Sequence, residues 1–216
     1  MIIQVESVQD KVYQQIKSDI RERRLEPGEK ITIRGLADRY GVSTTPIREA
    51  LQRLHADGLL IFKRRAIIVR SLSAEEVHKI FEIRGRLESL AIEWAIARID
   101  GEAIARLKAI VDQMDNGTDL DTWRELNRRF HTTIYAYADS EHLLNFIENL
   151  WGAIDPYMRL YTLSVDSFGE AQWQHREILL ALEERDVDRA QNEVLRHLNH
   201  TAEIVVQALM SDTGHR

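Results

Sequence analysis

The chain has 216 residues, of which 44% are hydrophobic and 30% are charged, so it is long enough for one large domain or two small ones with proper cores. It contains no cysteine, which excludes disulfides and thiolate metal ligands, and no apolar run approaches the roughly 20 residues that a membrane-spanning helix needs. The N-terminus lacks the basic and apolar segments of a signal peptide, so we expect a cytoplasmic protein.

The charge is distributed unevenly along the chain. Residues 1–70 hold 14 Lys and Arg against 9 Asp and Glu, a net of +5, whereas the remaining residues hold 15 against 26, a net of −11. This asymmetry indicates a polyanion-binding segment joined to an acidic one, although a surplus of this size also fits an ordinary solvated surface.

Three helices are predicted in the first 58 residues. Apolar residues at helical spacing, such as Val12 and Ile16, predict the first helix, for which Ser7 is a suitable cap. Gly41 ends the second helix in the position that favours a left-handed residue, and Pro46 fits the first turn of the third. The predicted ranges are 8–25, 33–40 and 43–58.

Two short β runs follow, residues 59–62 and 66–70, and they flank a basic tip formed by Lys63, Arg64 and Arg65. Helix, short helix, turn, helix and basic hairpin together predict a winged helix-turn-helix domain over residues 1–72. Such a domain presents the start of its recognition helix to base edges in the major groove, and its hairpin to the DNA backbone or minor groove. The alternative is a simple helix cap and a solvated turn. The recognition residues expected here are Ser43, Thr44, Thr45 and Arg48.

Residues 73–216 predict only helices, so the fold class is mainly α, with an all-helical bundle after the winged domain. The spacing Ser73–Glu76 is that of a capping box, and Pro156 is expected to kink its helix. The predicted helices cover 74–100, 102–115, 120–138, 141–163, 169–185 and 187–210. The breaks between them are expected near 100–101 and at 116–117, 139–140, 164–167 and Asp186.

Four polar residues lie on apolar faces of these helices. Asn127 and His131 are one helical turn apart, and His175 and His197 each lie eleven residues from the turn at Asp186. Antiparallel helices would bring the last two to the same level, so three imidazoles and an amide oxygen could converge on a divalent ion such as zinc or nickel. The alternative is a set of ordinary buried histidines, the role expected of His55, His78, His142, His200 and His215.

Arg84 lies within the apolar stripe of its predicted helix, where a guanidinium needs an anionic partner. Glu88, one turn later, would give an intrahelical salt bridge. A ligand carboxylate is the other partner consistent with the pattern.

The N-terminal motif resembles the GntR family. The resemblance rests on Pro27–Gly28, Leu36–Ala37, the run GVSTTPIREAL over residues 41–51, Leu54 and Gly58–Leu59. It implies that Arg34 in the second helix contacts the operator together with the recognition residues. Thr44 stands where the family usually has Arg, which alters the expected operator sequence, and Ala66 stands where the wing usually has Gly.

The helical part resembles the FCD domain of the FadR branch of that family, through Arg84 with Glu88, Phe130–His131 and the other three candidate ligands. The resemblance implies that a divalent metal is held by Asn127, His131, His175 and His197, and that a small organic or sugar acid is sensed beside Arg84. Asn127 departs from the more usual Asp.

These observations predict a ligand-responsive, homodimeric DNA-binding regulator that is not an enzyme. One alternative keeps the DNA-binding function with a purely structural metal. The other is a metal-dependent hydrolase, since three histidines with an open position also suit catalytic zinc, but the sequence places no carboxylate as a general base.

Overall fold

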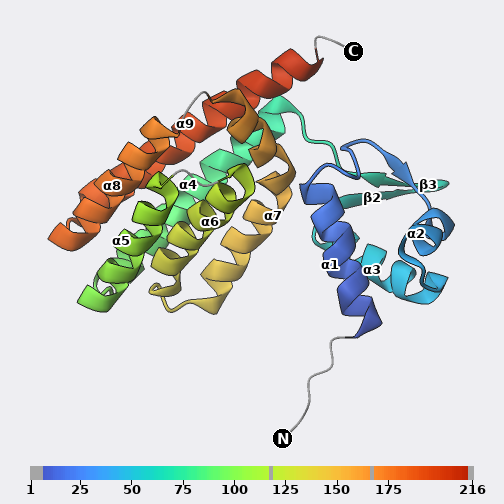
Figure 1. Cartoon of the computed structure of the whole chain (residues 1–216), viewed down its shortest axis with the longest axis horizontal. Coiled ribbons are helices and arrows are strands. Elements are labelled where there is room, and N and C mark those ends of the chain that lie inside the picture. Colours follow the sequence, from blue (N-terminus) through green and yellow to red (C-terminus); the bar gives the residue numbers. More distant parts are fainter. Residues whose placement is uncertain (1–6, 117–118, 166–167, 214–216) are drawn as a thin grey trace, which may run out of the picture. The chain divides into compact units, whose positions relative to one another are not determined.

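The computed structural model describes residues 7–116, 119–165 and 168–213 (Figure 1). Contacts within the chain divide it into two compact units, Met1–Ser73 with Trp151–Arg159, and Ala74–Leu150 with Leu160–Arg216. The predicted breaks at Gly117 and 166–167, and His215, lie outside the described residues.

Among its described residues, the first unit contains three complete helices, the Trp151–Arg159 part of α7 (Glu141–Ser164) and a small antiparallel sheet. The helices are α1 (Val8–Arg21), α2 (Ile33–Tyr40) and α3 (Thr44–Ala56), and the strands are β1 (Lys30–Ile31), β2 (Leu60–Lys63) and β3 (Ala66–Val69). The sheet has the order β1-β3-β2, with Lys30 opposite Ile68. The predicted winged helix-turn-helix fold is therefore confirmed. The sequence prediction missed β1, because two residues are too few to show alternation.

The helix ends in this unit follow the predicted signals closely. The Ser7 side chain accepts a hydrogen bond from the Asp10 N–H at the start of α1. The Thr32 hydroxyl caps α2, and Gly41 ends it with φ of 65°, in the left-handed region. The predicted first helix was four residues too long, because α1 ends at Arg21.

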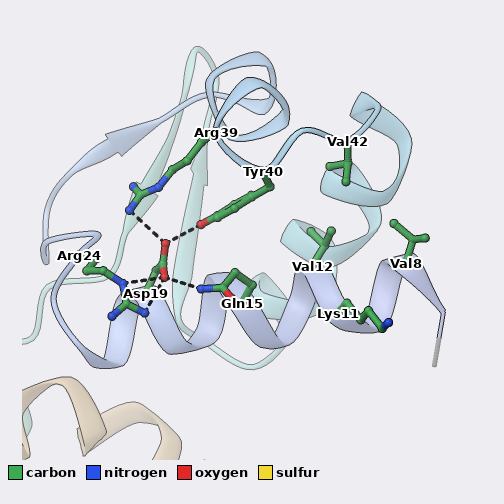
Figure 2. A pocket seen from close by; sticks show the side chains of 9 residues that line it. All are labelled: Val8, Lys11, Val12, Gln15, Asp19, Arg24, Arg39, Tyr40 and Val42. Atoms are coloured by element: carbon green, nitrogen blue, oxygen red, sulfur yellow. Dashed lines mark hydrogen bonds and ion pairs between the residues drawn. The ribbon is translucent and has the colours of Figure 1, made fainter.

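A buried carboxylate joins α1 to α2 in the same unit. Asp19 is 2% exposed and accepts hydrogen bonds from Tyr40 and Gln15 (2.8 and 2.9 Å). It also forms ion pairs with Arg24 and Arg39 (2.8 and 3.1 Å; Figure 2). Burial alone would raise the pKa of Asp19, but the hydrogen bonds from Tyr40, Gln15 and Arg24 outweigh it and hold the pKa below its ordinary value. The pocket beside this cluster is also lined by Val8, Lys11, Val12 and Val42.

The second unit is built entirely from helices within the described residues. They are α4 (Ala74–Ile96), α5 (Gly101–Asp115), α6 (Leu120–Ala136), α8 (Gly169–Glu184), α9 (Val187–Thr213) and the parts of α7 (Glu141–Ser164) outside Trp151–Arg159. α9 packs along α4 and α8, and α5 packs against α6 and α8. The predicted all-helical fold is thus confirmed. In the part of the chain that is described, no helix is both long and apolar enough to cross a membrane.

The break predicted at Asp186 is present, because Arg185 and Asp186 separate α8 from α9. Arg185 adopts the left-handed conformation, with φ of 56°, and its guanidinium donates to the carbonyls of Ile96 and Ile99 (3.2 and 3.1 Å). The Asp186 side chain instead accepts from the Arg189 N–H at the start of α9 (3.0 Å). α7 runs through Pro156, and the predicted kink stays a prediction.

Candidate metal centre and nucleic-acid interface

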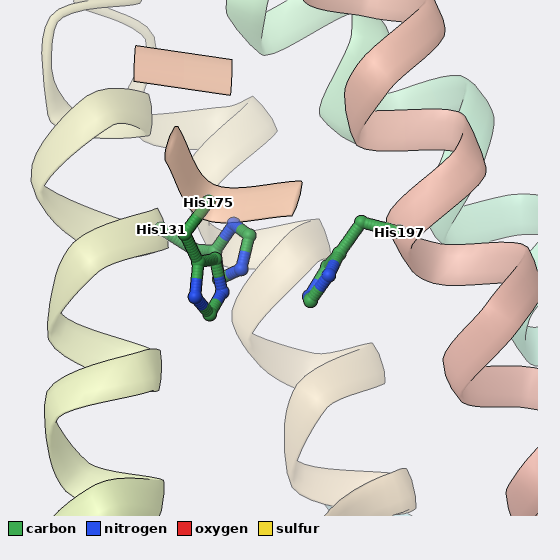
Figure 3. A group of neighbouring side chains, drawn as sticks. All are labelled: His131, His175 and His197. Atoms are coloured by element: carbon green, nitrogen blue, oxygen red, sulfur yellow. The ribbon is translucent and has the colours of Figure 1, made fainter. Parts of the chain in front are cut away.

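Three histidines from three different helices meet inside the second unit. His131 comes from α6, His175 from α8 and His197 from α9, and their rings point toward one another (Figure 3). One ring nitrogen of each lies within 4.8 Å of those of the other two. All three side chains are buried. The structure therefore brings together the histidines that the sequence singled out.

Asn127 completes the predicted set of four from one turn before His131 on α6. It is 7% exposed, and its Oδ1 atom is buried with no hydrogen-bond partner among the described residues. The Nε2 atom of His175 is in the same situation. Orphaned buried acceptors are costly, so they indicate a place where a missing partner would bind.

The hydrogen bonds on the far side of the rings fix which nitrogen carries the proton. The Gln172 amide N–H donates to Asp115 Oδ1 (2.8 Å) and the Val111 carbonyl (3.4 Å), so its oxygen accepts from His175 Nδ1 (3.0 Å). The Gln174 N–H donates to Glu170 (3.1 Å), and its oxygen accepts from His197 Nδ1 (2.9 Å). In both rings Nδ1 therefore carries the hydrogen and Nε2 presents a lone pair.

The environment keeps the imidazoles neutral. Burial lowers the pKa of each well below its ordinary value, and a neighbouring histidine ring lowers it further. The positive charge of Arg84 adds to this effect at His131 and His197. Neutral imidazoles are the form that binds divalent metals.

This donor set fits a divalent cation. Imidazole nitrogens with an amide oxygen suit zinc or nickel, and tetrahedral Zn–N bonds of about 2.1 Å place the nitrogens about 3.4 Å apart. The observed limit of 4.8 Å therefore requires the rings to move inward when the ion binds. A hydrogen-bond acceptor on the ring nitrogen that does not bind the ion is the arrangement that orients metal-binding histidines.

Arg84 is paired with Glu88 inside the same unit. Its Nε donates to Glu88 Oε1 at 2.8 Å, and the two side chains are 4% and 0% exposed. The Tyr135 hydroxyl donates to the other oxygen of Glu88 at 2.5 Å and lies 3.3 Å from His131 Nδ1. The salt bridge that the sequence offered as one alternative is present, and the ligand role of Arg84 stays a prediction.

Three of these contacts were missed in the sequence. Tyr135 lies four residues after His131 and Gln172 three before His175, so helical spacing could have identified both. Gln174 reaches His197 on a different helix, and no sequence signal indicates that pairing.

The predicted DNA-contacting residues all lie on the surface of the first unit. Among the residues described, Arg34 and Arg48 form no ion pair, whereas Arg53 pairs with Asp10 (2.7 Å). Ser43 occupies the cap position of α3, but its hydroxyl makes no capping hydrogen bond. The exposed candidates are Arg34, Ser43, Thr44, Thr45, Arg48, Lys63, Arg64 and Arg65.

The wing tolerates Ala66 without backbone strain. Ala66 is the first residue of β3, opposite Lys63, and it has no positive φ. The tip residues Arg64 and Arg65 also avoid the left-handed region. Glycine is therefore not required at this turn.

A winged helix-turn-helix unit with an exposed recognition helix and basic wing defines a DNA-binding protein, here with a second, all-helical domain. Residues 8–69 match the model for bacterial regulatory proteins of the gntR family, and residues 79–200 match the FCD domain. The chain therefore belongs to the GntR family of transcriptional regulators, within the group that carries an FCD domain.

Individual relatives agree with this assignment. The chain is 33% identical to the uncharacterized HTH-type transcriptional regulator YdhC of Bacillus subtilis, over 88% of each chain. It is 31% identical to the HTH-type transcriptional repressor GlaR of Escherichia coli, over 91% of this chain and 95% of the relative. The solved structure of E. coli McbR/YncC shares the fold, with a TM-score of 0.78, 24% identity and coverage of 94% and 99%. Both YdhC and GlaR are described as HTH-type transcriptional regulators.

Proposed function

We propose that this DNA-binding regulator changes its operator affinity when a small organic or sugar acid binds at a divalent metal, zinc or nickel. Asn127, His131, His175 and His197 would hold the ion. The observation that carries the proposal is the convergence of three histidines whose lone pairs are available. At least two of these three buried neutral imidazoles have Nδ1 committed to a glutamine oxygen, which leaves Nε2 as the nitrogen with the lone pair, and one nitrogen of each ring lies within 4.8 Å of the others.

The bound ion would supply a positive centre for a carboxylate oxygen. Four neutral ligands would leave the charge of the ion uncompensated, which favours an anionic effector. The guanidinium of Arg84, close enough to depress the pKa of His131 and His197, adds a second positive group for the same carboxylate.

The DNA-binding function rests on the first unit. Arg48 and the short polar residues before it would read bases from the start of α3, with Arg34 on the backbone. The basic tip between β2 and β3 would follow the phosphates. Acting in the cytoplasm as a homodimer, the protein would place two recognition helices on a two-fold operator, and effector binding would alter their spacing.

One alternative keeps the metal structural, with the effector elsewhere or absent. The buried pair between Arg84 and Glu88 favours it, because Arg84 already has an anionic partner.

A thermal-shift screen of small carboxylic and sugar acids, with and without chelator, separates the two. We expect at least one acid to raise the melting temperature only in the metal-loaded chain, since a ligand of the folded state must stabilise it. The same acid should change operator affinity in a mobility-shift titration. Stabilisation that survives chelation, or an unchanged operator affinity, would contradict a metal-bound effector.

A further inference from the structure

A continuous buried hydrogen-bonded chain connects Arg84 on α4 to His131 on α6. It runs from the Arg84 guanidinium to Glu88 (2.8 Å), from Glu88 to the Tyr135 hydroxyl (2.5 Å), and from Tyr135 to His131 Nδ1 (3.3 Å). None of these four side chains is more than 4% exposed. Polar groups this deeply buried interact in a low local dielectric, where each hydrogen bond strongly affects the next.

Three contacts together assign the hydrogens along this chain. Tyr135 has a single proton, and the short distance to Glu88 places that proton on the carboxylate side. Its oxygen is then only an acceptor toward His131, so Nδ1 must carry the ring hydrogen.

We propose that Tyr135, held by Glu88, is a positioning residue that keeps His131 in the Nδ1–H tautomer and so directs its Nε2 lone pair to the metal. Through Glu88, the metal affinity then depends on which anion Arg84 binds. This inference rests on the proposed metal centre and adds its regulation.

The dependence on Arg84 follows from the shared carboxylate. Glu88 divides its negative charge between the guanidinium on one oxygen and the tyrosine on the other. When Arg84 turns to another anion, Glu88 becomes a stronger acceptor for Tyr135, and His131 becomes a better metal donor. By linkage, metal binding then favours anion binding at Arg84 to the same degree.

The first test compares Zn²⁺ affinity, by competition with a chromogenic chelator, in the wild type, Tyr135→Phe and Tyr161→Phe. Tyr161 is a buried tyrosine of α7 whose ring stacks on Trp123, and among the described residues no ring contact or hydrogen bond joins it to the three histidines, so its variant is a matched loss of a phenol hydroxyl. Tyr135→Phe should weaken Zn²⁺ binding about 10- to 100-fold, the range for residues that hydrogen-bond to a metal ligand, and Tyr161→Phe should leave it unchanged.

The second test adds Arg84→Gln in both backgrounds. Removing the guanidinium should tighten Zn²⁺ binding in the wild type, and by a smaller factor in Tyr135→Phe, where the connection is cut. If Arg84→Gln changes the Zn²⁺ affinity by the same factor in both backgrounds, Arg84 acts only through its electrostatic field. That result would overturn the proposed regulation through Glu88.

The wild type provides a measurement that needs no stable variant. In the metal-free chain, ¹⁵N spectra of labelled histidine should show His131 with its proton on Nδ1; a proton on Nε2 would overturn the proposal.

If the wild type binds Zn²⁺ and the two tyrosine variants bind it equally, the positioning role fails while the metal centre stands. If the wild type binds no Zn²⁺, both fail.

Discussion

The buried pair between Arg84 and Glu88 allows a sharp test of the helical domain. Arg84→Gln removes the cation and leaves the Glu88 carboxylate in an environment where its side chain has no exposed surface. The double variant Arg84→Gln, Glu88→Gln removes both charges and keeps an amide oxygen that can accept from Tyr135. The single change should therefore be much more damaging than the double one.

The magnitude follows from the burial of the pair. Breaking a buried ion pair by removing one partner costs about 3 to 5 kcal/mol in the free energy of unfolding, whereas replacing both partners is often nearly neutral. For a domain of this size, each kcal/mol corresponds to roughly 2 to 4 °C, so the single variant should melt about 6 to 20 °C below the wild type. The double variant should recover most of that loss.

Tryptophan fluorescence is a suitable assay, because three of the four tryptophans, Trp94, Trp123 and Trp173, lie in the second unit. Melting temperatures are compared for the metal-free wild type and both variants. Equal melting temperatures for the single and double variants would refute the argument from an unpaired buried charge. An acid that stabilises the wild type but not the folded double variant would support the ligand role of Arg84, and an equal response would remove it.

Three further predictions concern the other sites. Arg48→Ala should weaken operator binding by about 1 to 3 kcal/mol and relax the sequence preference, whereas replacing Arg64 and Arg65 by alanine should weaken binding to all DNA and reduce its salt dependence. Both effects are measured by mobility-shift titration, and normal operator binding by Arg48→Ala would contradict this placement of the recognition helix. Asn127→Asp should raise the affinity for the metal and lower the affinity for a carboxylate at fixed metal occupancy, because the aspartate cancels one unit of the metal charge. Calorimetric titrations in which the variant binds the metal more weakly and the carboxylate more tightly would reject a charge-based effect. Asp19 has a lowered pKa in the folded state, so its stabilising contribution is complete above the unfolded pKa of 3.8 and is lost as the pH falls through the folded pKa. In calorimetric melting, Asp19→Asn should therefore be less stable than the wild type at neutral pH and equally stable in acid. A loss of stability that persists in acid would exclude this carboxylate as the cause.

The helices were predictable because each carries its own periodic and capping signals. Thr32 and Gly41 bound α2 as expected, and every predicted helix ends within four residues of the observed one. β1 was missed because its two residues are defined only by pairing with β3, a contact distant in sequence. The left-handed residue before α9 is Arg185, which has none of the usual sequence marks of a turn.

The candidate metal ligands were predictable for a related reason. Asn127 and His131 share one helix face, and the hairpin of α8 and α9 brings His175 level with His197, their ring centroids 4.8 Å apart. The groups that orient these rings were not predicted, because Gln174 and Glu88 act across helices through side-chain packing. Pairing of that kind depends on the tertiary structure and not on spacing along one helix.

The most direct test of a metal-centred regulator is the divalent metal content and Zn²⁺ affinity of the gently purified chain beside His175→Ala and His197→Ala. We expect one divalent ion per wild-type chain and loss of tight binding in either variant, with the helical fold retained by circular dichroism. A wild-type chain that neither retains nor binds Zn²⁺, or histidine variants that bind it as tightly, would rule out the metal centre.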